Sequence, residues 1–196
     1  MLGRRSLEFV RTLVAHGVDV NARHRKQKAG NGRLNRTDTT PFLLAAQAAD
    51  VPLMRLLVEL GADPLLSNTT NSTPLMVAAG LGTASPGEDP GTEPEVLEAV
   101  ALAIELGGDL NAVDDNGETV MHGAAYKHFP AVVELVYEAG ADIDVWNQEN
   151  RQGWTPLDIV EGGIHVGMNI LKSAPTAAAI REVMVREGVE PAPQPR

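Results

Sequence analysis

Apolar residues recur along the chain at the spacing of an α-helix, in which positions i, i+3, i+4 and i+7 share one face. Three such stripes predict amphipathic helices whose apolar faces lie in the core. They are Leu53, Leu56, Leu57 and Leu60; Val96, Val100, Ala103 and Ile104; and Val132, Leu135 and Val136. The stretch from Ser6 to His16 has the same character. The pattern therefore predicts a chain built mainly of short helices.

Each of the three striped helices is preceded by a shorter apolar run that begins at a threonine, and a fourth such run follows the last helix. The four threonines are Thr40, Thr73, Thr119 and Thr155, and all but Thr119 are followed by proline. A threonine hydroxyl can cap free N–H groups at a helix start, and a proline in the first turn gives up no hydrogen bond. The longer helices are expected to start at Pro52, at Pro130 and at the capping box Thr92-Glu93-Pro94-Glu95, and to end at glycines. These glycines are Gly17, Gly61, Gly107 and Gly140.

The spacing between these signals is regular. Thr40 to Gly61 and Thr119 to Gly140 both span 21 residues, and Gly61 to Thr73 and Gly107 to Thr119 both span 12. Since 21 and 12 add to 33, each unit has the length of a two-helix repeat. A pattern that recurs along the chain is much stronger evidence for a repeat than a single short match.

The period and the motifs resemble the ankyrin repeat family. Thr73-Pro74-Leu75-Met76-Val77-Ala78 is similar to its Thr-Pro-Leu-His-x-Ala signature, and Gly61-Ala62-Asp63 and Gly140-Ala141-Asp142 match its Gly-Ala-Asp segment. The resemblance covers nearly the whole chain. It implies an all-α, ankyrin-repeat solenoid of stacked helix-turn-helix units with projecting β-hairpin finger loops. The Gly- and Pro-punctuated style resembles bacterial members of the family.

This alignment predicts a repeat domain over residues 1–190 and a Pro-rich, disordered tail over residues 191–196. The domain would consist of a partial repeat at 6–22 and of repeats that begin near residues 40, 73, 119 and 155. Departures from the 33-residue period place insertions near 23–37, 80–94 and 162–175. Because no Thr-Pro helix precedes Ser6, we expect the chain to be the C-terminal part of a longer array, with the apolar face of its first helix uncovered.

Composition and charge argue against nucleic-acid binding by most of the chain and against a membrane-spanning segment. Residues 1–36 hold nine Lys/Arg against two Asp/Glu, and the other residues hold seven against twenty-four, so a basic segment precedes an acidic body in a chain of net charge −10. Nucleic acid would be repelled by the body, while the basic segment is either a solvated loop or a local contact for an acidic surface. No apolar stretch is long enough to cross a bilayer, and no signal peptide is visible, which favours a cytoplasmic location by default.

The sequence offers little for catalysis or for binding a cofactor or metal. There is no cysteine, and the five histidines form no pair with metal-ligand spacing. Gly162-Gly163-Ile164-His165-Val166-Gly167 lacks the ending of a phosphate-binding loop and is predicted to be a turn. The acidic insertion around Glu88 and Asp89 lacks EF-hand spacing, so a solvated loop is preferred to a calcium site. His122 stands at the family's Thr-Pro-Leu-His place, where the resemblance implies a hydrogen bond between repeats.

The resemblance implies that a partner lies against the finger loops and the exposed side of the first helices. The positions that match this surface are Gln47, Ala48, Gly80, Leu81, Tyr126 and Lys127, joined by the finger residues Arg23, Arg25, Asn68, Asp114, Asp115, Trp146, Asn147 and Arg151. Trp, Tyr and Arg are enriched among interface hot spots, which favours Trp146, Tyr126 and Arg151. Trp154, which directly precedes Thr155, is instead expected to pack on the base of a finger.

We therefore predict a non-catalytic module that binds another protein and needs no cofactor. It would be monomeric unless the open face of the first helix self-associates. Two alternatives stay open: a structural spacer or C-terminal cap of a larger protein, and an array that recruits substrate for an enzyme whose catalytic domain lies elsewhere.

Overall fold

A computed structural model describes residues 4–25, 34–87, 90–166 and 169–191, and its regular structure is almost entirely helical. The predicted tail beyond residue 191 and most of the basic segment lie outside the described residues. The elements are α1 (Arg4–Ala15), α2 (Pro41–Gln47), α3 (Val51–Glu59), α4 (Pro74–Ala79), α5 (Glu93–Glu105), α6 (Val120–Lys127), α7 (Pro130–Glu138), α8 (Ile143–Trp146), α9 (Pro156–Gly162), β1 (Ile164–Val166), β2 (Asn169–Leu171) and α10 (Ala174–Arg186).

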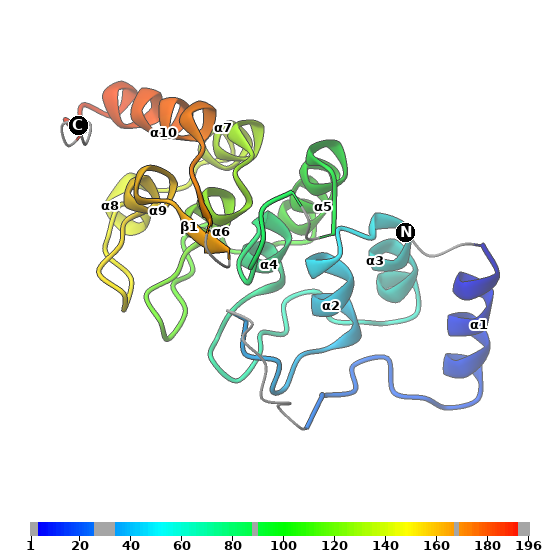
Figure 1. The fold of residues 1–196 in the computed structure, drawn as a ribbon. Helices are drawn as coiled ribbons and strands as arrows, with labels where there is room; N and C mark the ends of the chain where they lie inside the picture. Colours follow the sequence, from blue (N-terminus) through cyan, green and yellow to red (C-terminus); the bar gives the residue numbers. More distant parts are fainter. Residues whose placement is uncertain (1–3, 26–33, 88–89, 167–168, 192–196) are drawn as a thin grey trace.

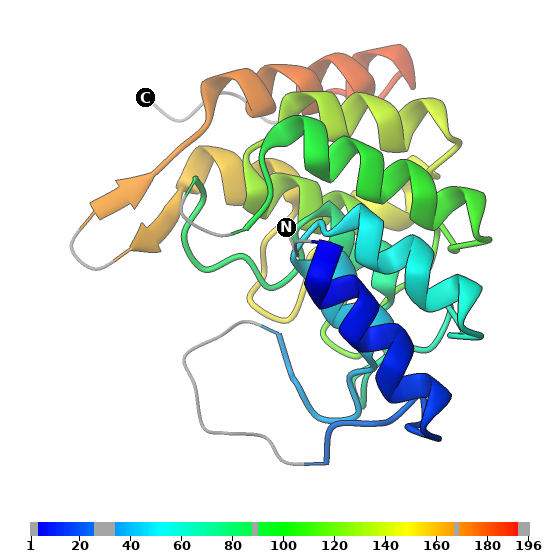
Figure 2. The same cartoon turned by 90° about the vertical axis from the view of Figure 1, so that its right-hand side faces the viewer.

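The helices form two rows (Figure 1). Helices α2, α4, α6 and α9 form the inner row, each in contact with the next, and α3, α5, α7 and α10 form the outer row. Each inner helix also packs against the outer helix that follows it in the chain. Figure 2 shows the outer helices side by side. This stack of helix-turn-helix units confirms the predicted fold class.

Small residues allow the inner helices to approach closely. The alanine pairs Ala45/Ala46, Ala78/Ala79 and Ala124/Ala125 are buried. At Gly123 in α6, a Cβ atom would lie 2.7 Å from the carbonyl oxygen of Met76 in α4. Any larger residue at this position would therefore push the two helices apart.

The threonines cap the inner helices as predicted. The Oγ1 atoms of Thr40, Thr73 and Thr155 each accept a hydrogen bond of 3.2 Å from the backbone N–H three residues later, and that of Thr119 accepts a weaker one of 3.5 Å. Each such cap stabilises a helix by about 1 kcal/mol. These four starts set the register of the stack.

Helix α1 stands at the N-terminal end beside α3, to which Arg11 is joined by a 2.7 Å ion pair with Glu59. Val10 packs against the core. Phe9 and Leu13 are 62% and 38% exposed, so much of the apolar surface of α1 is uncovered.

The finger loops are hairpin turns, and no β-strand is assigned to their described residues. The longer first finger, before Thr40, is closed between His24 N and Thr39 O at 3.0 Å. The second, third and fourth fingers, with tips at residues 68–72, 114–118 and 150–154, are each closed by a backbone hydrogen bond between two residues four positions apart, such as Asp114 N to Glu118 O at 2.9 Å and Asn150 N to Trp154 O at 3.0 Å. Side chains close the same turns from inside, because the Oδ1 atoms of Asn68, Asp114 and Asn150 each accept two backbone N–H groups of their own loop. All three residues stand five positions before a capping threonine.

The segment between α4 and α5 folds back over the inner row. Leu81 and Thr83 in it are buried, and Lys127 of α6 donates a 2.6 Å hydrogen bond to the carbonyl oxygen of Pro90. The insertion predicted near residues 80–94 thus covers part of the surface on which a partner was expected.

The segment after α9 differs from prediction. Instead of a turn over residues 162–167, Ile164–Val166 forms strand β1, which pairs antiparallel with β2 in the register Ile164↔Leu171. The alternating β-branched residues Ile164 and Val166 favour a strand, although the neighbouring glycines are typical of a turn. Gly163 has φ +88°, and a Cβ atom there would lie 2.4 Å from Ile170 Cγ2, so this position requires glycine.

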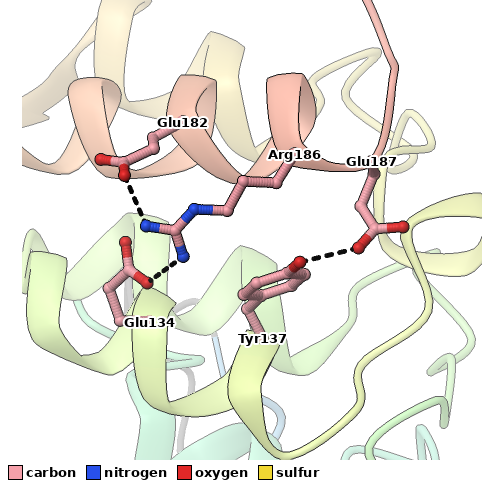
Figure 3. Close-up of polar contacts among 5 residues, drawn as sticks. All are labelled: Glu134, Tyr137, Glu182, Arg186 and Glu187. Carbon is pink, nitrogen blue, oxygen red and sulfur yellow. Dashed lines mark hydrogen bonds and ion pairs between the residues drawn. The ribbon is translucent and has the colours of Figure 1, made fainter.

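Helix α10 closes the C-terminal end by packing on α7 and α9. Its buried face includes Ile180, Val183 and Met184. At its exposed edge, Arg186 pairs with Glu134 of α7 at 3.1 Å and with Glu182 of its own helix, and the Tyr137 hydroxyl donates a 2.8 Å hydrogen bond to Glu187 (Figure 3). These polar contacts join α10 and the residue after it to α7 in the outer row.

Candidate binding surface

Several residues of the predicted surface do come together. Gln47, Ala48, Leu81 and Lys127 line one hollow of about 260 Å³, together with the exposed Leu44 of α2. Gly80 and Arg36 also contribute to its wall. The hollow lies where α2, α4 and α6 face the segment that follows α4.

Two further hollows continue along the inner row. A second, of about 280 Å³, shares Leu81 with the first and lies against the bases of the third and fourth fingers. A third, of about 200 Å³, shares Tyr126 and Trp154 with the second and extends to Ile164 at the start of β1. The three hollows share lining residues from one to the next, and we call them together the inner groove.

The two aromatic residues chosen as hot spots do not present their rings to solvent. Trp146 in α8 is 1% exposed and Tyr126 in α6 is 2% exposed. The finger that follows Gly140 begins with the short helix α8, which packs on α6 and turns the indole of Trp146 into the core. The expectation that these side chains reach a partner directly is therefore wrong for Trp146, and Tyr126 reaches only the wall of the inner groove.

Trp154 shows the opposite departure from expectation. It was predicted to pack on a finger base, yet it is 41% exposed and lines two of the hollows. Trp154 contacts the finger and α6 through backbone hydrogen bonds rather than through its ring. Its N–H donates to Asn150 Oδ1 at 3.1 Å, and its carbonyl oxygen lies 3.3 Å from His122 Nε2. An aromatic residue before a capping threonine gives no signal that separates these two roles.

The predicted arginines hold the fingers together. Arg23 donates to the carbonyl oxygens of Asp38 and Ser67, at 3.0 and 2.6 Å, and so ties the first finger to the second. The N–H of Arg151 donates to the carbonyl oxygen of Asn116 at 2.8 Å, which joins the fourth finger to the third. Arg25 is exposed at the edge of the described first finger, and Asn147, half-buried, follows α8. None of these four lines the inner groove.

Neighbouring fingers are joined edge to edge along the whole row. Thr69 N donates to Thr37 O at 3.1 Å and Asp115 N to Thr70 O at 3.0 Å. Side chains add to these links: Asn71 donates to Asp115 and Ser72 to Asp114, both at 2.8 Å. The finger side of the inner groove is consequently held in one arrangement before any partner binds, which lowers the entropy lost on binding.

A buried polar network forms the floor of the groove between the third and fourth fingers. Glu118, 6% exposed, accepts hydrogen bonds from the Tyr126 hydroxyl at 3.0 Å and from Asn150 Nδ2 at 3.1 Å. Asp114, also 6% exposed, accepts one from Ser72 Oγ. Hydrogen bonds thus hold both carboxyl groups in place.

His122 lies in the first turn of α6 and is fully buried. Its Nδ1 accepts from the backbone N–H of Thr119 at 3.2 Å, so the proton is on Nε2, which donates to the carbonyl oxygen of Trp154 at 3.3 Å. The expected hydrogen bond between repeats is confirmed. Burial lowers the pKa of His122 to about 4, which keeps the ring neutral at physiological pH.

Other chemistry is not assembled in the described part of the chain. Its histidines and carboxylates form no group of three or more that could hold a metal ion. No helix among residues 4–25, 34–87, 90–166 and 169–191 is both long and apolar enough to cross a membrane.

Comparison with known proteins matches residues 116–148 to the ankyrin repeat family. The matched residues run from the third finger through α6, α7 and α8. They contain Glu118, His122 and Tyr126, whereas Asp114 and Asn150 of the network at the floor of the groove lie just outside the match.

More extended matches link the chain to larger proteins. It is 29% identical over 160 residues to the E3 ubiquitin-protein ligase KEG of Arabidopsis thaliana, covering 79% of this chain and 8% of the ligase. The fowlpox virus protein FPV219, named as an ankyrin repeat protein, is 29% identical over 57% of this chain and 30% of its own length. Human protein fem-1 homolog C is 30% identical over 45% of this chain and 14% of its own length. The chain therefore spans less than a third of each of these relatives.

Proposed function

Starting from a chain that contains an ankyrin repeat within a stack of similar helical pairs, we propose that it is a non-catalytic module that binds another protein along the inner groove. Ankyrin repeats are generally protein-interaction modules. The observation that carries the proposal is the inner groove itself, because its three hollows follow the inner helices and finger bases and share lining residues from one to the next. A surface of this shape suits an extended segment of a partner better than a small molecule.

The groove also has the residue types that an interface core requires. Exposed apolar and aromatic side chains, Leu44 at 37% and Trp154 at 41%, stand in hollows that also have polar side chains in their walls. Hydrophobic anchors surrounded by satisfied polar groups are the usual arrangement at protein interfaces. We therefore expect Leu44 and Trp154, rather than Trp146 and Tyr126, to dominate the binding free energy.

The test is a selection of random displayed peptides on the immobilised chain, followed by measurement of dissociation constants for the retained peptides. Leu44→Glu in the groove should weaken binding at least tenfold. Leu65→Glu is the matched control, since Leu65 is 53% exposed and lines none of the three hollows. Retained peptides that bind Leu44→Glu and Trp154→Ala as tightly as the unchanged chain would contradict the proposal.

A second candidate is that the array recruits a partner to an enzyme carried by another part of a larger protein. It is favoured by the match of most of this chain to a small portion of a plant protein named as a ubiquitin ligase. The same groove would serve this role, so the two candidates differ in the fate of the bound partner. The two candidates would be separated by an assay of whether a substrate fused to a selected peptide becomes ubiquitinated by a protein that contains this chain.

A further inference from the structure

The second hollow of the inner groove differs from its neighbours in charge. It lies where the segment after α4 meets the third and fourth fingers and measures about 280 Å³. Its wall consists of Leu81, Asp114, Asn116, Glu118, Tyr126, Gln152 and Trp154. Two of these residues are acidic and none is basic, a composition that favours a cationic group.

The carboxylates are fixed in place by the fold. Asp114 accepts hydrogen bonds from the backbone N–H groups of Asn116 and Glu118, at 2.8 and 3.0 Å, and takes part in no ion pair with another described residue. Glu118 accepts from the hydroxyl of Tyr126 and from the amide of Asn150. These donors orient the carboxyl groups, and the low exposure of both acids reduces screening by solvent.

An exposed indole faces the same space. Trp154 lines the hollow and is 41% exposed, although tryptophan is usually well covered in a folded chain. A cation placed between an aromatic face and a carboxylate is attracted by both groups. Arg151 supplies a positive charge only outside the wall, where its Nη1 lies 3.5 Å from Asn116 Oδ1.

We propose that this hollow receives an arginine side chain of the segment that occupies the inner groove. The planar guanidinium can stack on Trp154 while its N–H groups face the carboxylates, whereas the compact, strongly hydrated ammonium of lysine suits this arrangement less well. The inference rests on the proposed function and adds the chemistry of the partner: an extended peptide with an arginine at the position that meets the third and fourth fingers. The apolar first hollow then takes an uncharged residue of the same segment.

The peptide selection separates the two proposals. Pools selected on the unchanged chain should be enriched in arginine at one position, and Glu118→Gln should remove that enrichment while still retaining peptides. Glu149→Gln is the matched control, because it makes the same change of charge on an exposed residue of the fourth finger that does not line the hollow. Peptides retained without any basic preference would overturn the arginine site and leave the proposed function standing.

A direct titration tests the site without a partner. N-acetyl-arginine amide, followed by NMR, should shift the Trp154 indole N–H signal in a saturable manner, with that signal assigned from Trp154→Phe. Its neutral isostere, N-acetyl-citrulline amide, should bind at least tenfold more weakly. Glu118→Gln should weaken the arginine derivative tenfold or more, and Trp154→Ala, an exposed position that the fold does not require to be aromatic, should do so as well.

Equal binding of the arginine and citrulline derivatives would overturn the inference, as would an unchanged affinity in both variants. If no peptide is retained by any form of the chain, the proposed function fails, and the titration alone then decides whether the hollow binds a guanidinium group.

Discussion

At the scale of single residues, His122 takes part in a helix cap, is buried in the core and makes a hydrogen bond between repeats. Burial lowers its pKa to about 4, below the ordinary value of 6.5, so the folded chain takes up fewer protons than the unfolded chain between these pH values. The contribution of His122 to the free energy of unfolding should thus be fully present above pH 6.5. It should be lost, by up to about 3 kcal/mol, as the pH is lowered toward 4. Urea denaturation at several pH values between 4.5 and 7.5 measures this loss.

The part of this pH dependence that belongs to His122 can be isolated by substitution. His122→Gln should be less stable at pH 7.5, yet lose less stability between pH 6.5 and 5 than the unchanged chain. His16→Gln is the control, since His16 is exposed and its removal should leave the slope as it was. An equal slope in the unchanged chain and His122→Gln would show that other groups govern the pH dependence.

Residue types at the groove could be predicted only in part. Gln47, Ala48, Leu81 and Lys127 line one hollow because their positions in the repeat place them at the ends of α2, α4 and α6 or directly after them. The exposure of each side chain could not be predicted in the same way. Trp146 is buried because the four-residue helix α8 turns it inward, and such a short helix leaves no periodic pattern in the sequence.

At the scale of elements, the finger loops depend on one polar residue each. In the fourth finger, Asn150 accepts the N–H groups of Gln152 and Trp154 and donates to both Glu118 and Tyr126. Asn150→Ala should lower the free energy of unfolding by about 2–3 kcal/mol, because it leaves buried groups without their partners. Glu149→Ala, at an exposed position of the same finger, should have a much smaller effect. Comparable losses in the two variants, measured by urea denaturation, would contradict this assignment.

Helix α10 should be held in place by its apolar face rather than by the polar contacts of Figure 3. Ile180 is fully buried, and Ile180→Ala should cost about 2–5 kcal/mol. Arg186 is exposed, so Arg186→Ala should change the unfolding midpoint little, and high salt should remove even that difference. A midpoint shift for Arg186→Ala as large as that for Ile180→Ala would reverse this ranking.

The element boundaries show which signals the sequence contains. The starts of the inner helices could be predicted, since a capping threonine is a local signal that the tertiary structure has no reason to override. The paths of the two inter-helix segments could not. The first is set by long-range contacts such as that between Lys127 and Pro90, and the second contains strands of three residues, too short to show alternation clearly.

At the scale of the whole molecule, contacts between helices run almost entirely between neighbouring units of the stack. Stability in such an array is the sum of terms for each unit and for each interface, so the ends can open without the middle. Helix α1 has an exposed apolar surface and reaches α3 through an exposed ion pair, whereas α4 and α6 have neighbours on both sides. A helix of its length has little stability of its own in water.

Native-state hydrogen exchange should therefore show a gradient along the stack. The amides of α1 should exchange through local opening, with much lower protection than those of α4 and α6, which should open only with the whole array. Ile180→Ala should lower protection in α9 and α10 first, because the loss falls on the last interface. Uniform protection from α1 to α10, or an equal loss at both ends in Ile180→Ala, would mean that the chain opens as one cooperative unit. In that case, the preformed finger row and the inner groove would open only when the whole chain unfolds.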